Sequence, residues 1–253
     1  MKRPTTIDEV LAELDKIVEV AVAENNTAAI FAYVYRRTTA AIKQGIEEGI
    51  FEDNERMHQF DVLFANLYIE AWHGYRNQKV ISESWRIAFE AEKENLIILQ
   101  HLILGMNAHI NLDLGHAAAQ IMKDKQLEDL KSDFMKVNQI LFSLTDELQQ
   151  GLGKVSPLLF LADWLGKRND EQLINFGIDK ARRFSWVTAE RIWQEKENDS
   201  KMEVVHSVDQ TVAQLGQLMR HPKGWVLKFV LRVIAWFEER EIRKIIVGFK
   251  GMI

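Results

Sequence analysis

Three ionisable side chains follow one another at helical spacing near the middle of the chain. His109, Asp113 and His116 occupy positions i, i+4 and i+7, which places them within about 60° of one another on one helix face. Imidazole and carboxylate groups one turn apart can bind a zinc, iron or manganese ion, and without metal the carboxylate can orient the imidazole as a base. A buried histidine satisfied by a carboxylate has the same spacing. The pattern therefore predicts a site and leaves its chemistry open.

The helix expected over residues 95–123 carries polar groups on two faces. Asn107 and Asn111 are also one turn apart, but they point away from His109. Gly105, one turn before His109, leaves room for a ligand or for the close approach of another helix. Because each polar side chain in such an apolar helix needs a partner, we expect this helix to lie at the centre of a bundle.

A second concentration of polar groups lies in the helix expected over residues 54–76. His58, Asp61, Ala65, Tyr68 and Trp72 follow steps of three and four on one side of it. The flanking residues are apolar, so Asp61 is expected to be buried and to complete a site with His109 and Asp113, with the side chains of Asp61 and His109 within about 8 Å. The alternative interpretation of Asp61 is an aspartate on the helix surface, exposed to solvent.

Other residues are expected to bind a ligand around this site. Tyr68, Trp72 and Trp85 could form its walls, with the polar Asn107 and Asn111 beside them. Arg76 could supply a charge for an anion, although a solvated or salt-bridged arginine is the commoner arrangement. The predicted catalytic residues are His109, Asp113 and Asp61, and the predicted metal ligands are Asp61, His109, Asp113 and His116.

Several segments together resemble a known family. They are Asp61-x-x-Phe64-Ala-Asn-x-Tyr68, Trp85-x-x-Ala88-Phe89, the run from Gln100 to Leu114 that contains Asn-Ala-His-Ile-Asn-x-Asp-Leu, and Asp133-Phe134-x-x-Val137-Asn138. Over residues 55–140 they resemble an uncharacterised bacterial family, a domain of unknown function with the signature N-A-H-I-N-x-D-L. The resemblance implies that Asp61, His109 and Asp113 belong to the family's motif, and it implies no activity.

A weaker similarity concerns metal chemistry. The His109-x-x-x-Asp113 pair is similar to the metal-binding pairs of the helical zinc-dependent phospholipase C and single-strand nuclease group. That group uses several such pairs, whereas this chain offers one, so a trinuclear zinc site is not expected. Glu-x-x-His pairs at Glu55, Glu70 and Glu203 match one part of a di-iron pattern, but two of them fall on the same expected helix and none on the helix of His109.

Composition excludes several classes of protein. The chain of 253 residues has 32 Lys and Arg against 37 Asp and Glu, a formal charge of −5, which disfavours nucleic acid as a partner. It has no cysteine, so disulfides and thiolate metal sites are excluded. Signatures of nucleotide-binding loops, serine hydrolases and zincins are missing. The N-terminal residues lack the apolar core of a signal peptide and no apolar run is long enough to cross a membrane, so a cytoplasmic protein is expected.

The chain is expected to be all-α, a single domain over residues 1–253. With three prolines and 13 glycines it has few helix breakers, and apolar residues recur at three-and-four spacing throughout. A capping box at Thr6–Glu9 opens the first helix, and a loop at Gly151–Gly153 could divide the chain near 151–156. Further helices are expected over 27–48, 54–76, 82–92, 95–123, 126–150, 156–165, 170–197, 201–220 and 223–248.

The segment 225–237 within the last of these helices has two interpretations. Its aromatic residues with Lys228 and Arg232 are compatible with a helix lying on a membrane surface or forming a dimer face. The acidic residues that follow it favour a closing core helix whose cations reach the surface.

Two functions remain open from the sequence. The first is a metal-dependent enzyme, a hydrolase, in which Asp61, His109 and Asp113 hold one divalent ion that activates water. The second is a non-catalytic helical protein that binds a small or lipid-like ligand beside a buried network of the same residues. A homo-oligomer is compatible with both.

Overall fold

The protein is a bundle of helices, as the sequence predicts. The computed structural model describes residues 2–159, 161 and 170–250, and these contain no strand. The helices are α1 (Ile7–Ala23), α2 (Ala28–Glu47), α3 (Asn54–Arg76), α4 (Glu83–Glu90), α5 (Ile98–Ala108), α6 (Leu114–Ile121), α7 (Lys131–Val155), α9 (Asp170–Gln194), α10 (Asn198–Arg220), α11 (Trp225–Phe237) and α12 (Ile242–Lys250). Short 3-10 turns form η1 (Ala91–Lys93) and η3 (Leu127–Leu130), and a π-helical turn, η2 (His109–Asp113), joins α5 to α6.

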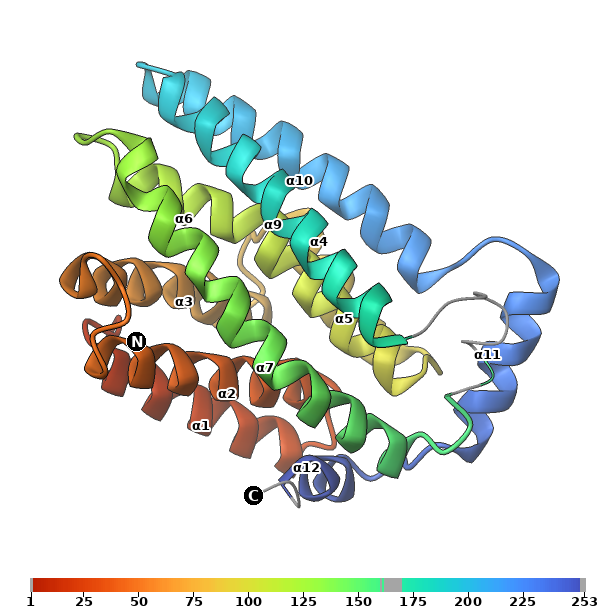
Figure 1. Cartoon of the computed structure of the whole chain (residues 1–253). Helices are drawn as coiled ribbons and strands as arrows, with labels where there is room; N and C mark the ends of the chain where they lie inside the picture. The colour runs from red at the N-terminus through yellow and green to blue at the C-terminus, as the bar shows by residue number, and fades with distance from the viewer. Residues whose placement is uncertain (1, 160, 162–169, 251–253) are drawn as a thin grey trace.

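The continuous segment α5–η2–α6 runs through the middle of the bundle (Figure 1). On one side it packs against α2 and α3, and on the other against α9 and α10. Helix α4 covers α5 together with α10, while α7 contacts α2, α9 and α12. The expected central position of the helix that carries His109 is therefore confirmed.

Glycines allow this central segment to approach its neighbours closely. A Cβ atom on Gly105 would lie 2.5 Å from Cγ of Phe31 in α2, and one on Gly115 would lie 2.6 Å from the backbone oxygen of Ser185 in α9. Both distances are too short for any larger residue. Close contacts thus fix the segment on both sides of the π-helical turn.

The first helix begins as its sequence predicts. The hydroxyl of Thr6 accepts a hydrogen bond from the backbone nitrogen of Glu9 at 3.2 Å, and the apolar positions Val10, Leu14 and Ile17 are buried. The carboxylate of Glu9 bonds to Thr5 and not to the Thr6 backbone, so only half of the capping box forms as written.

Two sequence predictions about the C-terminal half are wrong. Gly151 and Gly153 do not form a loop, because α7 continues through them to Val155 and the intervening Leu152 is buried against the core. A single helix over 223–248 is also wrong, since the chain leaves helical geometry at Glu238. The buried Glu238 carboxylate accepts hydrogen bonds from the Ile98 backbone, at 2.8 Å, and from the Ser156 hydroxyl, so it caps α5 and ends α11. Half of the helix predicted over 156–165 lies outside the described residues, and residues 156–159 form a turn instead of its first turn of helix.

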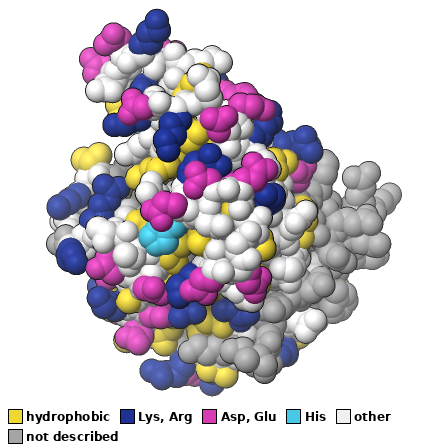
Figure 2. All heavy atoms as spheres, turned by 60° about the vertical axis from the view of Figure 1, so that its left-hand side comes forward, with side chains coloured by type: hydrophobic (Ala, Val, Ile, Leu, Met, Phe, Trp, Pro, Cys, Tyr) yellow, Lys and Arg dark blue, Asp and Glu magenta, His cyan; other side chains and the backbone are white. Residues whose placement is uncertain are grey.

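Helix α11 is more exposed than a closing core helix would be. Only Ile234 and Ala235 are fully buried, whereas Trp225 and Trp236 are 80% and 84% exposed. Across the part of the chain that the structure describes, no helix is both long and apolar enough to cross a membrane. Elsewhere on the surface, Figure 2 shows basic and acidic side chains interspersed on one face without a large area of one sign.

Candidate functional site

A π-helical turn distinguishes the segment that carries His109 and Asp113. In a π-turn the backbone hydrogen bonds run from i to i+5, and such turns inside α-helices are frequent at functional sites. Nδ1 of His109 lies 3.1 Å from Oδ2 of Asp113, which makes a buried hydrogen-bonded pair. The two residues are thus brought together as expected. His116 is half-buried and bonds to neither of them.

Asp113 also has a partner from another helix. Nε1 of Trp85 in α4 donates a hydrogen bond to the same Oδ2 atom at 2.9 Å. Burial raises the pKa of Asp113 to about 8, because the bond from Trp85 offsets only part of the cost of ionising the carboxyl away from water. The indole of Trp85 holds the Asp113 carboxyl, and the expected role of Trp85 as a ligand wall stays a prediction.

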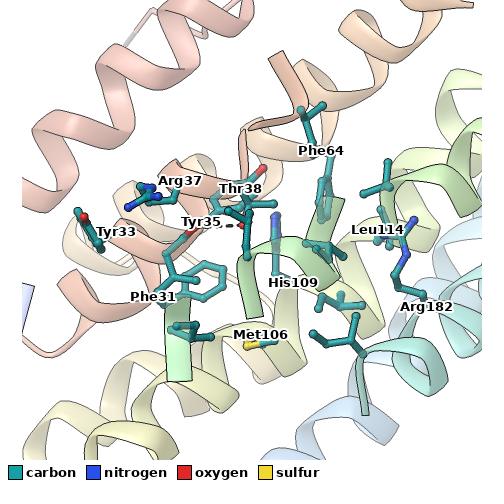
Figure 3. Close-up of a pocket in the computed structure, with 18 of the residues that line it drawn as sticks. Phe31, Tyr33, Tyr35, Arg37, Thr38, Phe64, Met106, His109, Leu114 and Arg182 are labelled. Atoms are coloured by element: carbon teal, nitrogen blue, oxygen red, sulfur yellow. Dashed lines mark hydrogen bonds between the residues drawn. The ribbon is translucent and has the colours of Figure 1, made fainter. Parts of the chain in front are cut away.

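Aromatic rings enclose the His109 imidazole. It stacks on Phe64 with the ring centroids 3.7 Å apart. It also packs edge to face with Tyr35, where the ring centroids are 4.3 Å apart. Figure 3 shows the imidazole rising from η2 between these two rings. Burial lowers the pKa of His109 well below its usual value, so the imidazole is neutral near pH 7. Its Nε2 atom is buried and has no hydrogen-bond partner among the described residues.

Asp61 is buried in α3, as expected, although it forms no hydrogen bond or ion pair with His109. Burial raises its pKa to about 7. Burial of Tyr35 raises the pKa of its hydroxyl most, and the nearby charge of Asp61 raises it further. The Thr39 hydroxyl lies near enough to Tyr35 to lower that pKa, but without completing a hydrogen bond. Tyr35 therefore feels the charge of Asp61 and also contacts the ring of His109.

A group of unpartnered polar atoms results, which we call the polar cluster. The members belong to Tyr35 and to four residues that touch its ring or shift its pKa, and each is a buried side-chain atom without a hydrogen-bond partner in the described part of the chain. The members are the hydroxyls of Tyr35, Thr39 and Tyr68, Oδ2 of Asp61 and Nε2 of His109. An unsatisfied buried polar atom costs about 1–3 kcal/mol, so five would approach the whole stability of a typical domain, about 5–15 kcal/mol. The cluster therefore has the chemistry of a place that holds water or a polar group of a ligand.

The other predicted ligand residues have different positions. Tyr68 is fully buried in the polar cluster, and its ring packs edge to face with Phe31 with the ring centroids 5.1 Å apart. Trp72 is buried and packs against Phe89, with the ring centroids 5.8 Å apart. Arg76 lies at the end of α3, where it forms a two-bond ion pair with Glu24, so the structure does not bring it to the site.

Asn107 and Asn111 face α10, on the side away from His109, as expected. Nδ2 of Asn111 donates to Oδ1 of Asn107, and Nδ2 of Asn107 donates to the backbone oxygen of Val212, both at 2.9 Å. Gly216 makes room for this contact, since a Cβ there would lie 3.3 Å from the Asn107 amide. The two amides hold the central segment against α10.

The geometry gives little support to the predicted metal site. Within the described residues, which include Asp61, His109, Asp113 and His116, no three His, Asp or Glu side chains gather closely enough to hold an ion. His109 Nδ1 and Asp113 Oδ2 are hydrogen-bonded to each other, which leaves Nε2 as the imidazole nitrogen open to a ligand. A metal at these residues stays a prediction.

Two apolar cavities lie beside the His109 segment. The small cavity, about 120 Å³, is lined by His109, Phe64 and Tyr35 among mostly apolar side chains from α2, α5, α7 and α9 (Figure 3). The large cavity, about 690 Å³, lies between α5, α7, α9 and α10 and includes Asn107 and Asn111 in its wall. The two share the lining residues Met106, Ile110, Leu148 and Ile178.

The sequence analysis missed Tyr35, Thr39 and Arg182. The spacing of Phe31, Tyr35 and Thr39, one turn apart on an otherwise apolar face, is a signal that could have placed the first two beside the site. Arg182 is followed directly by Arg183, and nothing in the sequence separates the buried arginine from the exposed one.

Comparison with known proteins assigns the chain to a family. A family model described as a family of unknown function, DUF5995, matches residues 7–222. The protein belongs to this family. The curated proteins and the solved structures that were compared contain no match. The DUF5995 match supports the expected uncharacterised domain, whereas the N-A-H-I-N-x-D-L signature and the similarity to zinc-dependent phospholipases stay predictions.

The DUF5995 match covers most of the site and omits the last two helices. It includes the polar cluster and the whole lining of the large cavity, but it ends before α11 and α12. One residue that lines the small cavity, Phe249, lies beyond it. Asp133, in the last of the segments that resemble the family, lies outside the site. Its buried carboxylate accepts hydrogen bonds from the backbone of Glu52 and Asp53 and from the side chain of Arg56, and so it stabilises the start of α3.

Proposed function

We propose that this protein binds a small, chain-like apolar molecule, with the body of the ligand in the large cavity and one end in the small cavity beside His109. The observation that carries the proposal is the pair of apolar cavities that share one wall next to the polar cluster. Such a protein binds its ligand without catalysing a reaction. In it, the hydrogen bond with Asp113 would hold the His109 imidazole in the orientation that the ligand meets.

The sizes of the cavities favour this function. Ligand pockets measure about 300–1,000 Å³, and the large cavity, at about 690 Å³, falls within that range. The small cavity, about 120 Å³, is close to an engineered apolar cavity of about 150 Å³ that holds benzene. Met106 and Ile110 line both, so a flexible chain could pass between them.

The metal-dependent hydrolase that the sequence predicts is the second candidate, and the hydrogen-bonded His109–Asp113 pair is the observation that favours it. Its weakness is the missing third ligand described above. Elemental analysis of protein purified without a histidine tag separates the two candidates. A stoichiometric metal would favour the hydrolase, and an organic ligand without metal would favour the binding protein.

We also propose that α11 contacts membrane surfaces. Trp225, Phe229 and Trp236 lie on the same helix face as Lys228 and Arg232, and the three aromatic side chains are exposed. The acid next in sequence, Glu238, is buried as the cap of α5 and so does not face a membrane. Trp236→Ala should weaken sedimentation with phosphatidylserine-containing vesicles, and Val247→Ala on α12 should not. A concentration-dependent dimer that covers α11 would contradict this proposal.

The main proposal is tested by ligand binding to purified protein. Native mass spectrometry before and after organic extraction should reveal a co-purified apolar molecule, and 1-decanol should displace the neutral dye Nile red. Leu215→Trp, in the wall of the large cavity, should weaken decanol binding at least about tenfold because the indole fills the space.

Leu218→Trp is the matched control for that variant. Leu218 lies one turn further along α10, its exposure of 50% is close to the 41% of Leu215, and it does not line the cavity. Equal decanol affinity in both variants would contradict the proposed binding site. Binding of neither Nile red nor decanol to the unaltered protein, with no extracted ligand, would refute the proposed function.

A further inference from the structure

Arg182 is a buried cation that forms no ion pair with an acid among the described residues. Its side chain is 4% exposed. One guanidinium nitrogen donates to the backbone oxygen of Phe134, and the guanidinium carbon lies 4.3 Å from the centre of the Phe134 ring. Nε has no hydrogen-bond partner in the part of the chain that the structure describes. Arginine residues that are buried for structural reasons are normally paired.

The contacts of Arg182 offset only part of the cost of burying its charge. Moving a charged side chain out of water costs several kcal/mol, and a cation–π contact with one backbone hydrogen bond returns only part of that. Burial lowers the pKa of Arg182 to about 9, which shows that this environment disfavours the charge but leaves it in place at neutral pH. Asp179, whose charge raises the pKa of Arg182, forms its ion pair with the neighbouring Arg183.

Arg182 lies in the wall of the small cavity. Figure 3 shows Arg182 on the opposite side of this cavity from Tyr33 and Arg37. Among its described lining residues the cavity has these two arginines and no Asp or Glu. An anion that enters would therefore meet positive charge and a neutral imidazole, with no carboxylate in the described wall to repel it.

We infer that Arg182 binds the carboxylate of the ligand, so that the ligand class is a medium- or long-chain fatty acid. A carboxylate offers two oxygens in one plane, which fits the planar N–H groups of a guanidinium, and binding would neutralise both charges inside the apolar cavity. The alkyl chain then extends past Met106 and Ile110 into the large cavity. This inference rests on the proposed binding function and adds the chemistry of the ligand's head group.

The test compares three ligands that share one chain. Decanoate, 1-decanol and 1-aminodecane are titrated into the unaltered protein at neutral pH by Nile red displacement. Decanoate should bind at least about tenfold more tightly than decanol, and the ammonium should bind more weakly than decanol. No preference for decanoate in the unaltered protein would overturn the inference without the use of any variant.

Two adjacent arginines supply the variant and its control. Arg182→Met should bind decanol as the unaltered protein does and should lose the preference for decanoate, whereas Arg183→Met should keep it, because Arg183 is exposed and pairs with Asp179. A preference that persists in folded Arg182→Met would assign the carboxylate to other residues and overturn the inference. If decanol and decanoate both fail to bind the unaltered protein, the proposed function itself is refuted.

Discussion

Asp61 gives the sharpest prediction, because it is a buried acid without a hydrogen-bond partner for Oδ2 among the described residues. Its pKa is raised from an ordinary value of 3.8 to about 7 in the folded protein. The folded state therefore holds a proton that the unfolded chain releases between about pH 4 and pH 7. Since stability falls with pH wherever the folded state binds more protons, this group stabilises the fold at low pH and loses that contribution as pH rises toward 7.

Asp61→Asn removes the titration and keeps the shape of the side chain. One pKa unit corresponds to about 1.4 kcal/mol, and the linkage relation gives a loss of about 3 kcal/mol for the unaltered protein between about pH 4.5 and 7.5 from this residue. The Asn variant does not suffer this loss. Its free energy of unfolding, minus that of the unaltered protein, should therefore increase by about 3 kcal/mol over the same interval.

Urea unfolding at a series of pH values measures this difference directly. The double difference cancels the titration of Asp113 and of every other group that both proteins share. Asp124→Asn is the matched control for the substitution itself, because the side chain of Asp124 is 84% exposed. A difference that stays constant for Asp61→Asn as well would refute the reasoning, since it would mean that Asp61 ionises in the fold as readily as in the unfolded chain.

Three further substitutions test other parts of the structure. Gly105→Ala should lower the unfolding free energy by about 1–3 kcal/mol, because the new methyl group would overlap Phe31, and an unchanged melting temperature would contradict that packing. Asp133→Asn should cost about 1–3 kcal/mol, measured by urea unfolding, since it removes the charge that pairs with Arg56, whose side chain is 10% exposed; a loss below about 0.5 kcal/mol would contradict this role. His109→Ala should lower the melting temperature through lost packing and should leave the metal content unchanged, and an unchanged melt with lost metal would instead favour the metalloenzyme.

Periodicity in the sequence predicted most of the helices because it reflects burial directly. The range 54–76 coincides with α3, and 27–48 differs from α2 by one residue at each end. The failures have local causes that no residue type announces. Tertiary packing of Leu152 overrides the flexibility of the glycines around it, and the break after α11 depends on Glu238 meeting α5, about 140 positions earlier.

The candidate site was only partly predictable for a similar reason. The pairing of His109 with Asp113 follows from local spacing, so the sequence could show it. Tyr35 and Arg182 reach the site from helices that are far away in the sequence, and their role depends on which face each helix turns inward. A cavity is a property of the assembled side chains, and no single segment encodes it.

The π-helical turn at His109–Asp113 has one more consequence. A π-turn accommodates one residue more than the α-helix around it, so α5 and α6 face their neighbours as they would in an uninterrupted helix one residue shorter. Gly105 and Gly115, on either side, would keep their close contacts if one residue of the turn were deleted. Deletion of one residue should therefore change the geometry of the site without changing the architecture of the bundle. A protein that lacks Ile110 should fold as a helical protein in which the His109–Asp113 hydrogen bond can no longer form as it does here.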